Sequence, residues 1–260
     1  MIVFSAIVPH PLESIPGIGQ PSDRKKIKKT LASFKQLRIA LEKAAPDTVL
    51  IISPHAKMER YSFVINSAKK LVGDFSQFGV AEKYSYENDK AILNKIAYTC
   101  KEDELSFRLR RNPLDYGALI PLQHLLQNIQ PKVVHLAFSL MNYQQHFRYG
   151  QLLESVIGAH QSKRIAIIAS AELSHRLTSN APAGFSPEAE KFDREIVHHL
   201  GENNLLSIMS MHKEVIDKAA ECGLRSIIIL MGALHEEKYA FKLLSYEGPS
   251  GIGYLMARLI

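Results

Sequence analysis

The stretch IAIIASAELSH, residues 165–175, is the part of the chain that decides its fold. An unbroken apolar run of this length predicts a strand that is buried on both faces of a parallel sheet. Polar side chains follow the run at once, because Glu172 and His175 stand directly after it. The stretch therefore predicts a buried strand that delivers an acid and an imidazole to one edge of the sheet.

Two other runs have the same form. IVFSAIVPHP, residues 2–11, leads to His10, and VLIISPHAK, residues 49–57, leads to His55. In open α/β sheets, ligands bind beyond the carboxyl ends of the strands. We therefore expect the three strand ends to meet and to form a metal site or an acid–base site.

The rest of the chain alternates between helical and strand patterns, which is typical of a mostly parallel sheet covered by helices on both faces. The expected elements before the last strand are a helix from Ser22 or Asp23 to Ala45, a strand at 48–52, an irregular or short-stranded stretch at 56–88, helices at 88–103 and 118–129, a strand at 132–140, a helix at 145–160 and a strand at 164–170.

The C-terminal third departs from this alternation. Residues 176–185 form a Pro/Gly loop that is long enough to cover the strand ends as a lid. Helices are expected at 187–201 and 212–221, whereas periodicity does not settle the type of the run 224–234. The last stretch predicts two strands joined by a turn at 247–251. The expected fold is one α/β domain over residues 1–260, with a mostly parallel central sheet and a C-terminal strand pair.

Composition argues against several classes of protein. No apolar stretch is long enough to span a bilayer, and the first residues predict a strand rather than a secretion signal. The two cysteines, Cys100 and Cys222, offer no disulfide framework, so we expect reduced thiols and a cytoplasmic protein. The net charge of +6 is spread along the chain, which favours a solvated surface over a nucleic-acid-binding one.

The residues alone leave the chemistry open. Imidazole nitrogens at His10 and His55 suit iron, zinc, copper or nickel. Their spacing is not that of a local metal motif, so unrelated surface or hydrogen-bonding histidines are the alternative.

Seven blocks, in order along nearly the whole chain, carry a resemblance to a known family. They are SAIVPHPLESIPGIG, DTVLIISPHA, GDFSQFG, LDYGALIPL, AELSHRLTSNAPAGF, ECGLRSIIILMGAL and LLSYEGPSGIGY. Together they resemble the class III extradiol ring-cleavage dioxygenase beta-subunit-like superfamily, which includes protocatechuate 4,5-dioxygenase and the DOPA dioxygenases. Within it, the chain is most similar to the AmmeMemoRadiSam system branch, to which the Memo proteins are related.

The resemblance implies a metal centre. His10 and His55 match the two histidine ligands of non-haem iron(II), which is the expected metal, with zinc or another divalent ion as the alternative. His175 matches the histidine that acts as acid–base catalyst, and an imidazole titrates near neutral pH. Glu172 stands where Memo proteins carry an aspartate, so it could orient His175, bind metal or serve a structural role.

The third ligand is left open between two neighbours. Dioxygenases place a glutamate in this block and Memo proteins a cysteine, and the chain offers both Glu221 and Cys222. Adjacent side chains on a helix point about 100° apart, so both are not expected to bind equally. A small buried thiol and a solvated carboxylate are the structural alternative.

One departure concerns ring cleavage. Many dioxygenase-like members read Asp-His-Gly where this chain has Tyr116 between Asp115 and Gly117. A tyrosine donates a hydrogen bond but is no proton shuttle near neutral pH, since its ordinary pKa is about 10.

Three functions follow from the resemblance. The first is an iron-dependent, extradiol dioxygenase-like oxidoreductase acting on a small catecholic or phenolic substrate. The second is a metal-binding accessory protein like Memo, with an AMMECR1-domain or radical-SAM partner and no ring cleavage. The third is a metal-dependent hydrolase. No nucleic-acid or membrane partner is expected, and a homo-oligomer is left open.

Overall fold

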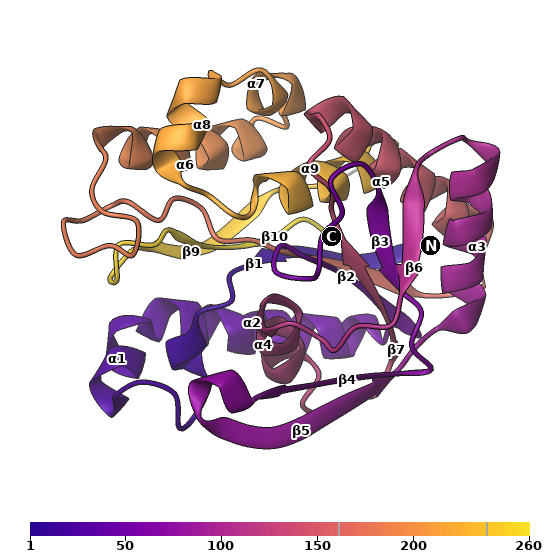
Figure 1. Ribbon diagram of the computed structural model, residues 1–260, viewed down its shortest axis with the longest axis horizontal. Helices are drawn as coiled ribbons and strands as arrows, with labels where there is room; N and C mark the ends of the chain where they lie inside the picture. Colours follow the sequence, from indigo (N-terminus) through magenta and orange to yellow (C-terminus); the bar gives the residue numbers. More distant parts are fainter. Residues whose placement is uncertain (161, 238) are drawn as a thin grey trace.

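A computed structural model describes residues 1–160, 162–237 and 239–260 (Figure 1). Its strands are β1 Ile2–Val8, β2 Thr48–Ser53, β3 Phe63–Asn66, β4 Lys70–Phe75, β5 Val80–Glu87, β6 Phe107–Arg110, β7 Lys132–Ala137, β8 Ile165–Ser170, β9 Lys242–Glu247 and β10 Tyr254–Arg258. Its helices are α1 Pro21–Lys26, α2 Lys28–Ala44, α3 Lys90–Glu102, α4 Tyr116–Leu125, α5 Tyr143–Gly158, α6 Pro187–Gly201, α7 Leu205–Met209, α8 Lys213–Ala219 and α9 Leu224–Ala233.

Eight strands form one sheet in the order β6-β3-β7-β2-β8-β1-β10-β9. The four central strands, β7, β2, β8 and β1, are parallel to one another. The C-terminal strands β10 and β9 extend the sheet beyond β1 as an antiparallel pair. The expected α/β fold, with a mostly parallel centre and a C-terminal strand pair, is confirmed.

The sheet separates two apolar layers, and alternate residues of β2 pack into one layer or the other. Leu50 and Ile52 pack into the layer under α3, α5, α6 and α9, while Val49 and Ile51 point into the layer under α2 and α4 (Figure 1). Successive side chains of a strand point to opposite faces, so a strand covered on both faces must be apolar throughout. Each such side chain contributes roughly 1.5–3 kcal/mol when fully buried.

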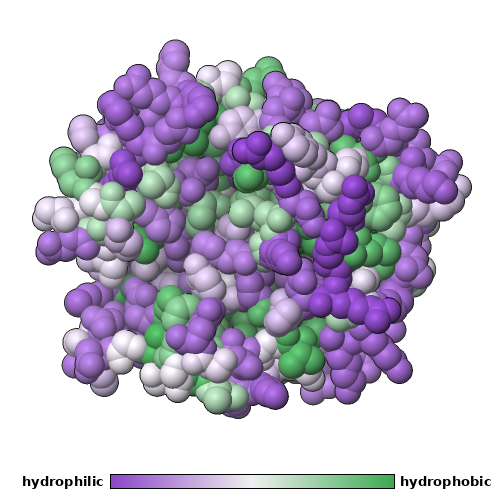
Figure 2. Space-filling view, viewed as in Figure 1, coloured by the Kyte–Doolittle hydropathy of each residue, from purple (hydrophilic) through white to green (hydrophobic). Residues whose placement is uncertain are grey.

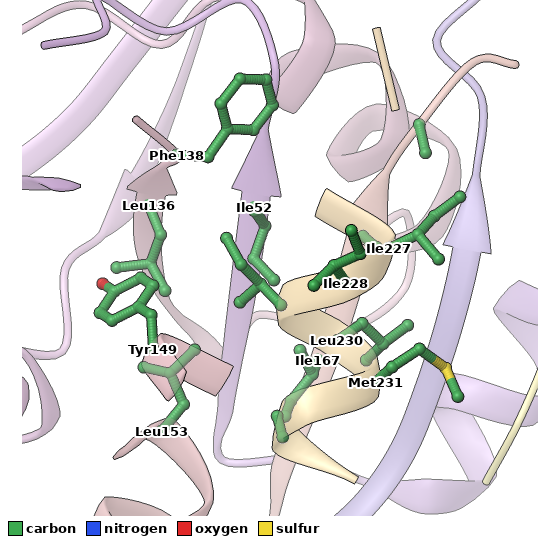
Figure 3. Close-up of a cluster of buried hydrophobic side chains, with 14 of the residues drawn as sticks. Ile52, Leu136, Phe138, Tyr149, Leu153, Ile167, Ile227, Ile228, Leu230 and Met231 are labelled. Atoms are coloured by element: carbon green, nitrogen blue, oxygen red, sulfur yellow. The ribbon is translucent and has the colours of Figure 1, made fainter. Parts of the chain in front are cut away.

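Helix α9 is the run whose type the sequence left unsettled. Its residues are almost all buried, between β8 on one side and α5 on the other (Figure 3). A helix that is covered all round has no polar face, so its apolar residues show no period of 3.6.

Elsewhere the structure refines the expected elements. The helix expected up to Ala45 is interrupted at Ile27, which leaves the helical conformation and is fully buried. The stretch 56–88 contains β3 and the hairpin β4–β5. Strand β4 packs against α4, whereas β5 has no buried residue. The short elements β6 and α7 were not expected, since neither is long enough to show a period.

The surface shows no unusual patch on the side drawn in Figure 2, where hydrophilic residues predominate and apolar residues lie in separate groups. Within the described ranges, none of the helices combines the length and the apolar character required to cross a membrane.

The crossing of α5 and α9 generates a test of the fold. A methyl group added at Gly150 would lie 2.2 Å from the Ile229 carbonyl oxygen, whereas at Gly158 of the same helix it would meet nothing within 4 Å. We expect Gly150→Ala to destabilise the protein by about 1–3 kcal/mol through overpacking. Gly158→Ala should leave the stability unchanged or raise it by up to about 1 kcal/mol.

Urea unfolding of both variants measures the difference. Equal unfolding midpoints for the two alanine variants would contradict the close approach of α5 to α9.

Candidate metal centre

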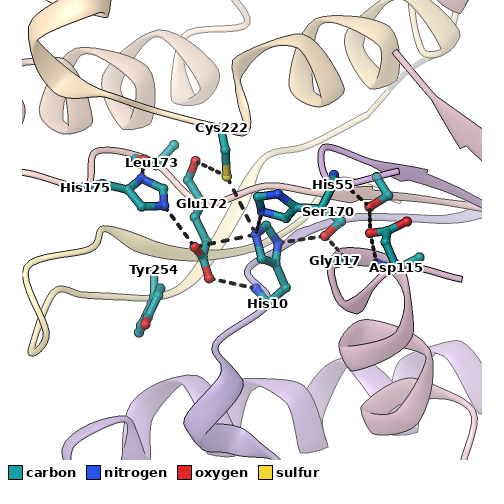
Figure 4. Close-up of polar contacts among 12 residues, drawn as sticks. His10, His55, Asp115, Gly117, Ser170, Glu172, Leu173, His175, Cys222 and Tyr254 are labelled. Carbon is teal, nitrogen blue, oxygen red and sulfur yellow. Dashed lines mark hydrogen bonds and ion pairs between the residues drawn. The ribbon is translucent and has the colours of Figure 1, made fainter. Parts of the chain in front are cut away.

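The site lies where three of the four central strands, β2, β8 and β1, end side by side. His10 follows β1, His55 follows β2, and Glu172 and His175 follow β8. Parallel strands present their carboxyl ends at one edge, so the three loops start from neighbouring points. The expected convergence of these histidines at the carboxyl edge is therefore found (Figure 4).

Two imidazoles and a thiol converge most closely. His10 Nε2 lies 3.0 Å from His55 Nε2 and 3.6 Å from Cys222 Sγ. The two rings stand nearly perpendicular, with centroids 4.8 Å apart. Among the described residues, one ligand atom from each of the three lies within 4.8 Å of the others.

This donor set fits a divalent metal. Two nitrogens that are each about 2.1 Å from one metal, at an angle of about 90°, lie about 3.0 Å apart, and that is the distance between the two Nε2 atoms. Imidazole and thiolate together suit zinc, copper or iron better than the oxygen-seeking magnesium or calcium. His10, His55 and Cys222 are therefore candidate ligands of one ion.

Glu172 and His175 form the second part of the site. Glu172 Oε2 lies 3.5 Å from His10 Nε2 and 3.3 Å from His175 Nε2, and its Oε1 accepts a hydrogen bond from the His10 backbone N–H at 3.2 Å. With Cys222, these two residues make a second group of ligand atoms within 4.8 Å. The Glu172 carboxylate thus lies between the metal-ligand candidates and His175.

Burial and charge set the protonation of the ligands. Burial lowers the pKa of His10, and burial with the neighbouring His10 lowers the pKa of His55 to about 4. Both imidazoles are therefore neutral near pH 7, as metal ligands must be. Burial, followed by the charges of Glu172 and Glu221, raises the pKa of the Cys222 thiol well above its ordinary value. A nearby cation is needed to make it a thiolate.

His175 differs from the other two histidines. Burial alone would lower its pKa, but the hydrogen bond and negative charge of Glu172 outweigh burial and raise it. Its Nδ1 lies 3.1 Å from the Leu173 carbonyl oxygen, which can only accept, so this nitrogen carries a proton. Nε2 is left as the atom that exchanges protons.

The structure separates the two candidates for the third ligand. Glu221 Oε2 accepts a hydrogen bond from the Leu224 backbone N–H at 2.6 Å and so caps the start of α9. Cys222 is directed to His10 instead, and its Sγ lies 3.8 Å from the Glu172 carbonyl oxygen. Gly223 allows this close approach, since a Cβ there would lie 2.5 Å from Ala171 Cβ.

Tyr116 forms one wall of the site. Its ring stacks on His55 with centroids 4.4 Å apart and stands edge-on to His10 at 5.8 Å. Burial, and then the charge of Glu172, raises the pKa of its phenol, which therefore stays protonated. Tyr116 can donate a hydrogen bond at the site but does not carry protons away from it.

Sequence reasoning missed the groups behind the ligands. Ser170 Oγ contacts His10 Nδ1 at 2.9 Å. Asp115 accepts hydrogen bonds from Ser53 Oγ and the Ala118 N–H, and its Oδ2 lies 3.0 Å from His135 Nε2. The sequence signal for the two serines, Ser53 and Ser170, is that each directly follows a run of apolar residues.

The fold and the site together define an α/β protein with a candidate metal centre at the carboxyl edge of its sheet. Residues 5–257 match the family described as the catalytic LigB subunit of aromatic ring-opening dioxygenase, and the chain belongs to that family. The chain is 28% identical to a curated protein of Clostridium acetobutylicum over 97% of its own length, and it spans 56% of the length of that relative. It also resembles the crystal structure of an uncharacterized protein from Escherichia coli K12, with a TM-score of 0.72, 12% identity and 99% of both chains covered.

The convergence of ligand atoms leads to a prediction about metal binding. We expect wild-type protein to bind one divalent first-row ion, and His10→Ala or His55→Ala to abolish stoichiometric binding, because each removes one of the two closest nitrogens. Cys222→Ala should weaken binding strongly, whereas Glu221→Gln should leave it within about twofold, since the Glu221 carboxylate caps a helix.

Metal content by elemental analysis after anaerobic purification, with circular dichroism as the control for folding, measures these effects. One ion per chain in both histidine variants would remove the proposed centre.

Proposed function

We propose that this protein is a non-haem iron(II)-dependent, extradiol dioxygenase-like oxidoreductase that acts on a catecholic or phenolic small molecule. The observation that carries the proposal is the 3.0 Å approach of His10 Nε2 to His55 Nε2 beside the Glu172–His175 pair. Membership in the ring-opening dioxygenase family supports the class of reaction.

The metal would be held by His10, His55 and Cys222, and when bound it supplies Lewis-acid polarisation of a coordinated oxygen. The side chains around the metal would bind and orient the substrate. Tyr116 offers a flat aromatic wall and a phenol that donates a hydrogen bond, both of which suit an aromatic ring with oxygen substituents.

His175 is the group that would move the substrate proton. Its Nε2 takes the proton of a substrate hydroxyl and later returns it, while Nδ1 keeps its own proton on the Leu173 carbonyl. The Glu172 carboxylate, 3.3 Å away, stabilises the imidazolium that forms. The proton thus leaves the substrate without leaving the site.

The loop 176–185 begins directly after His175 and would cover the substrate. It is tied down near its two ends, where Ala183 N donates to the His175 carbonyl and Leu177 N donates to the Gly251 carbonyl. Phe185, the last residue of this loop, is 63% exposed. Its apolar side chain would be available to contact a substrate when the loop closes. Closure of this loop would exclude water from the reacting groups.

His175→Ala tests the proton-transfer role. We expect the variant to keep its iron(II) and to lose at least about a hundredfold in rate, the usual contribution of a positioned acid–base group. The assay is oxygen uptake by iron-loaded protein with a panel of catechols and aminophenols.

His235→Ala is the matched control, because this half-exposed histidine lies beyond the other end of α9 from Cys222. No uptake by iron-loaded wild-type protein with any of these compounds would overturn the oxygenase proposal.

A second candidate is favoured by the thiol. Cys222, which lies beside His10, would be the third ligand where the resemblance gives ring-cleaving members a carboxylate. Tyr116, which stacks on His55, stands where many dioxygenase-like members have a histidine. Both features suit a Memo-like accessory protein that binds metal without cleaving rings, with an AMMECR1-domain or radical-SAM partner. Recovery of such a partner in a pull-down would support this candidate.

Tyr116→His distinguishes the two candidates. For an accessory protein we expect no oxygen uptake by the wild type and measurable uptake by the histidine variant, because the imidazole restores a proton-transfer group beside His55. For an oxygenase, uptake is already present in the wild type. Tyr116→Phe is the control, since it keeps the ring and removes only the hydroxyl.

A further inference from the structure

The Ser170 hydroxyl group connects His10 to α4, a helix that is distant from both residues in the sequence. Ser170 is the last residue of β8 and is fully buried. Its Oγ lies 2.5 Å from the Gly117 carbonyl oxygen in the first turn of α4. It also lies 2.9 Å from His10 Nδ1 (Figure 4). The two contacts together determine where the hydrogen atoms are.

The Gly117 carbonyl is available for this contact because of a proline. In an α-helix the carbonyl of residue i accepts from the N–H of residue i+4, which for Gly117 is Pro121. Proline has no N–H, and Pro121 lies inside α4. The sequence Gly-x-x-x-Pro therefore leaves one buried carbonyl without its helical donor, and Ser170 supplies the missing hydrogen.

The direction of the second bond follows from the first. A hydroxyl has one hydrogen, and a carbonyl oxygen can only accept. The Ser170 hydrogen therefore goes to Gly117, and Ser170 Oγ offers a lone pair to His10. His10 Nδ1 must then carry a hydrogen and donate it.

We propose that Ser170 is a positioning residue that fixes neutral His10 as the Nδ1-protonated tautomer, so that Nε2 presents a lone pair to a metal. The value of this tautomer rests on the proposed metal centre, because Nε2 is the atom that approaches His55 and Cys222. The wrong tautomer would place a hydrogen where the metal has to bind.

The Ser170–His10 hydrogen bond orients the His10 ring and links it to α4. Gly117 also lies close to the His55 loop, because a Cβ at this position would lie 2.8 Å from Ser53 Oγ and 3.1 Å from His55 Cδ2. Glycine thus lets the first turn of α4 reach both histidine loops.

Nitrogen NMR of metal-free protein with ¹⁵N-labelled histidine tests the tautomer directly, above neutral pH where imidazoles are uncharged. We expect a protonated Nδ1 and an unprotonated Nε2 for His10 in the wild type, and loss of this preference in Ser170→Ala. An Nε2-protonated His10 in the wild type would overturn the inference, whether or not the protein binds metal.

Zn²⁺ affinity, measured by competition with a chromophoric chelator, tests the consequence. Ser170→Ala should weaken Zn²⁺ binding about 10- to 100-fold, the usual effect of removing the partner of a ligand histidine. Ser170→Thr, which keeps the hydroxyl, should restore most of the affinity. An affinity of Ser170→Ala within twofold of the wild type would contradict the positioning role.

Ser5→Ala is the matched control. Ser5 is also fully buried, lies in the neighbouring strand β1, and its Oγ has no hydrogen-bond partner among the described residues. It should change neither the tautomer nor the affinity. If Ser170→Ala does not fold, the wild-type spectrum still decides the tautomer. A wild type with protonated Nδ1 that binds no metal supports the tautomer assignment and overturns the metal centre.

Discussion

The parallel pairing of β2, β8 and β1 is the constraint on which the site depends. Parallel strands end at the same edge, so three loops that are far apart in the sequence begin at neighbouring strand ends. The pairing needs both faces of the sheet to be covered, and the two apolar layers supply that cover. The rigidity of the ligand positions therefore comes from the core and not from the loops.

This arrangement concentrates ionisable groups in a buried place, and their mutual contacts stabilise them. Burial by itself raises the pKa of Glu172, but the neighbouring His10 imidazole, together with the hydrogen bond and positive charge of His175, outweighs burial and lowers the pKa overall. The carboxylate also accepts the His10 backbone N–H. A buried charge without such partners would cost several kcal/mol. Glu172 is thus part of the structure of the site as well as of its chemistry.

The sequence predicted the site residues that follow strands, and it failed for residues whose role depends on contacts between distant parts of the chain. Site candidates could be identified at His10, His55, Glu172 and His175 because each follows an apolar run. The role of Ser170 depends on a carbonyl that Pro121 leaves free in a helix far along the chain, and no local pattern shows that contact. The type of α9 was hidden for a related reason, since burial on all sides removes the periodicity that reveals a helix.

The donor set also bears on which substrate the pocket would accept under the proposed function. A divalent ion bound beside a Cys222 thiolate and the Glu172 carboxylate would already have two negative charges close to it. A doubly deprotonated catechol would add two more, and in a buried site unbalanced charge is costly. His175 is the group that can carry a compensating positive charge, because Glu172 favours its protonated form.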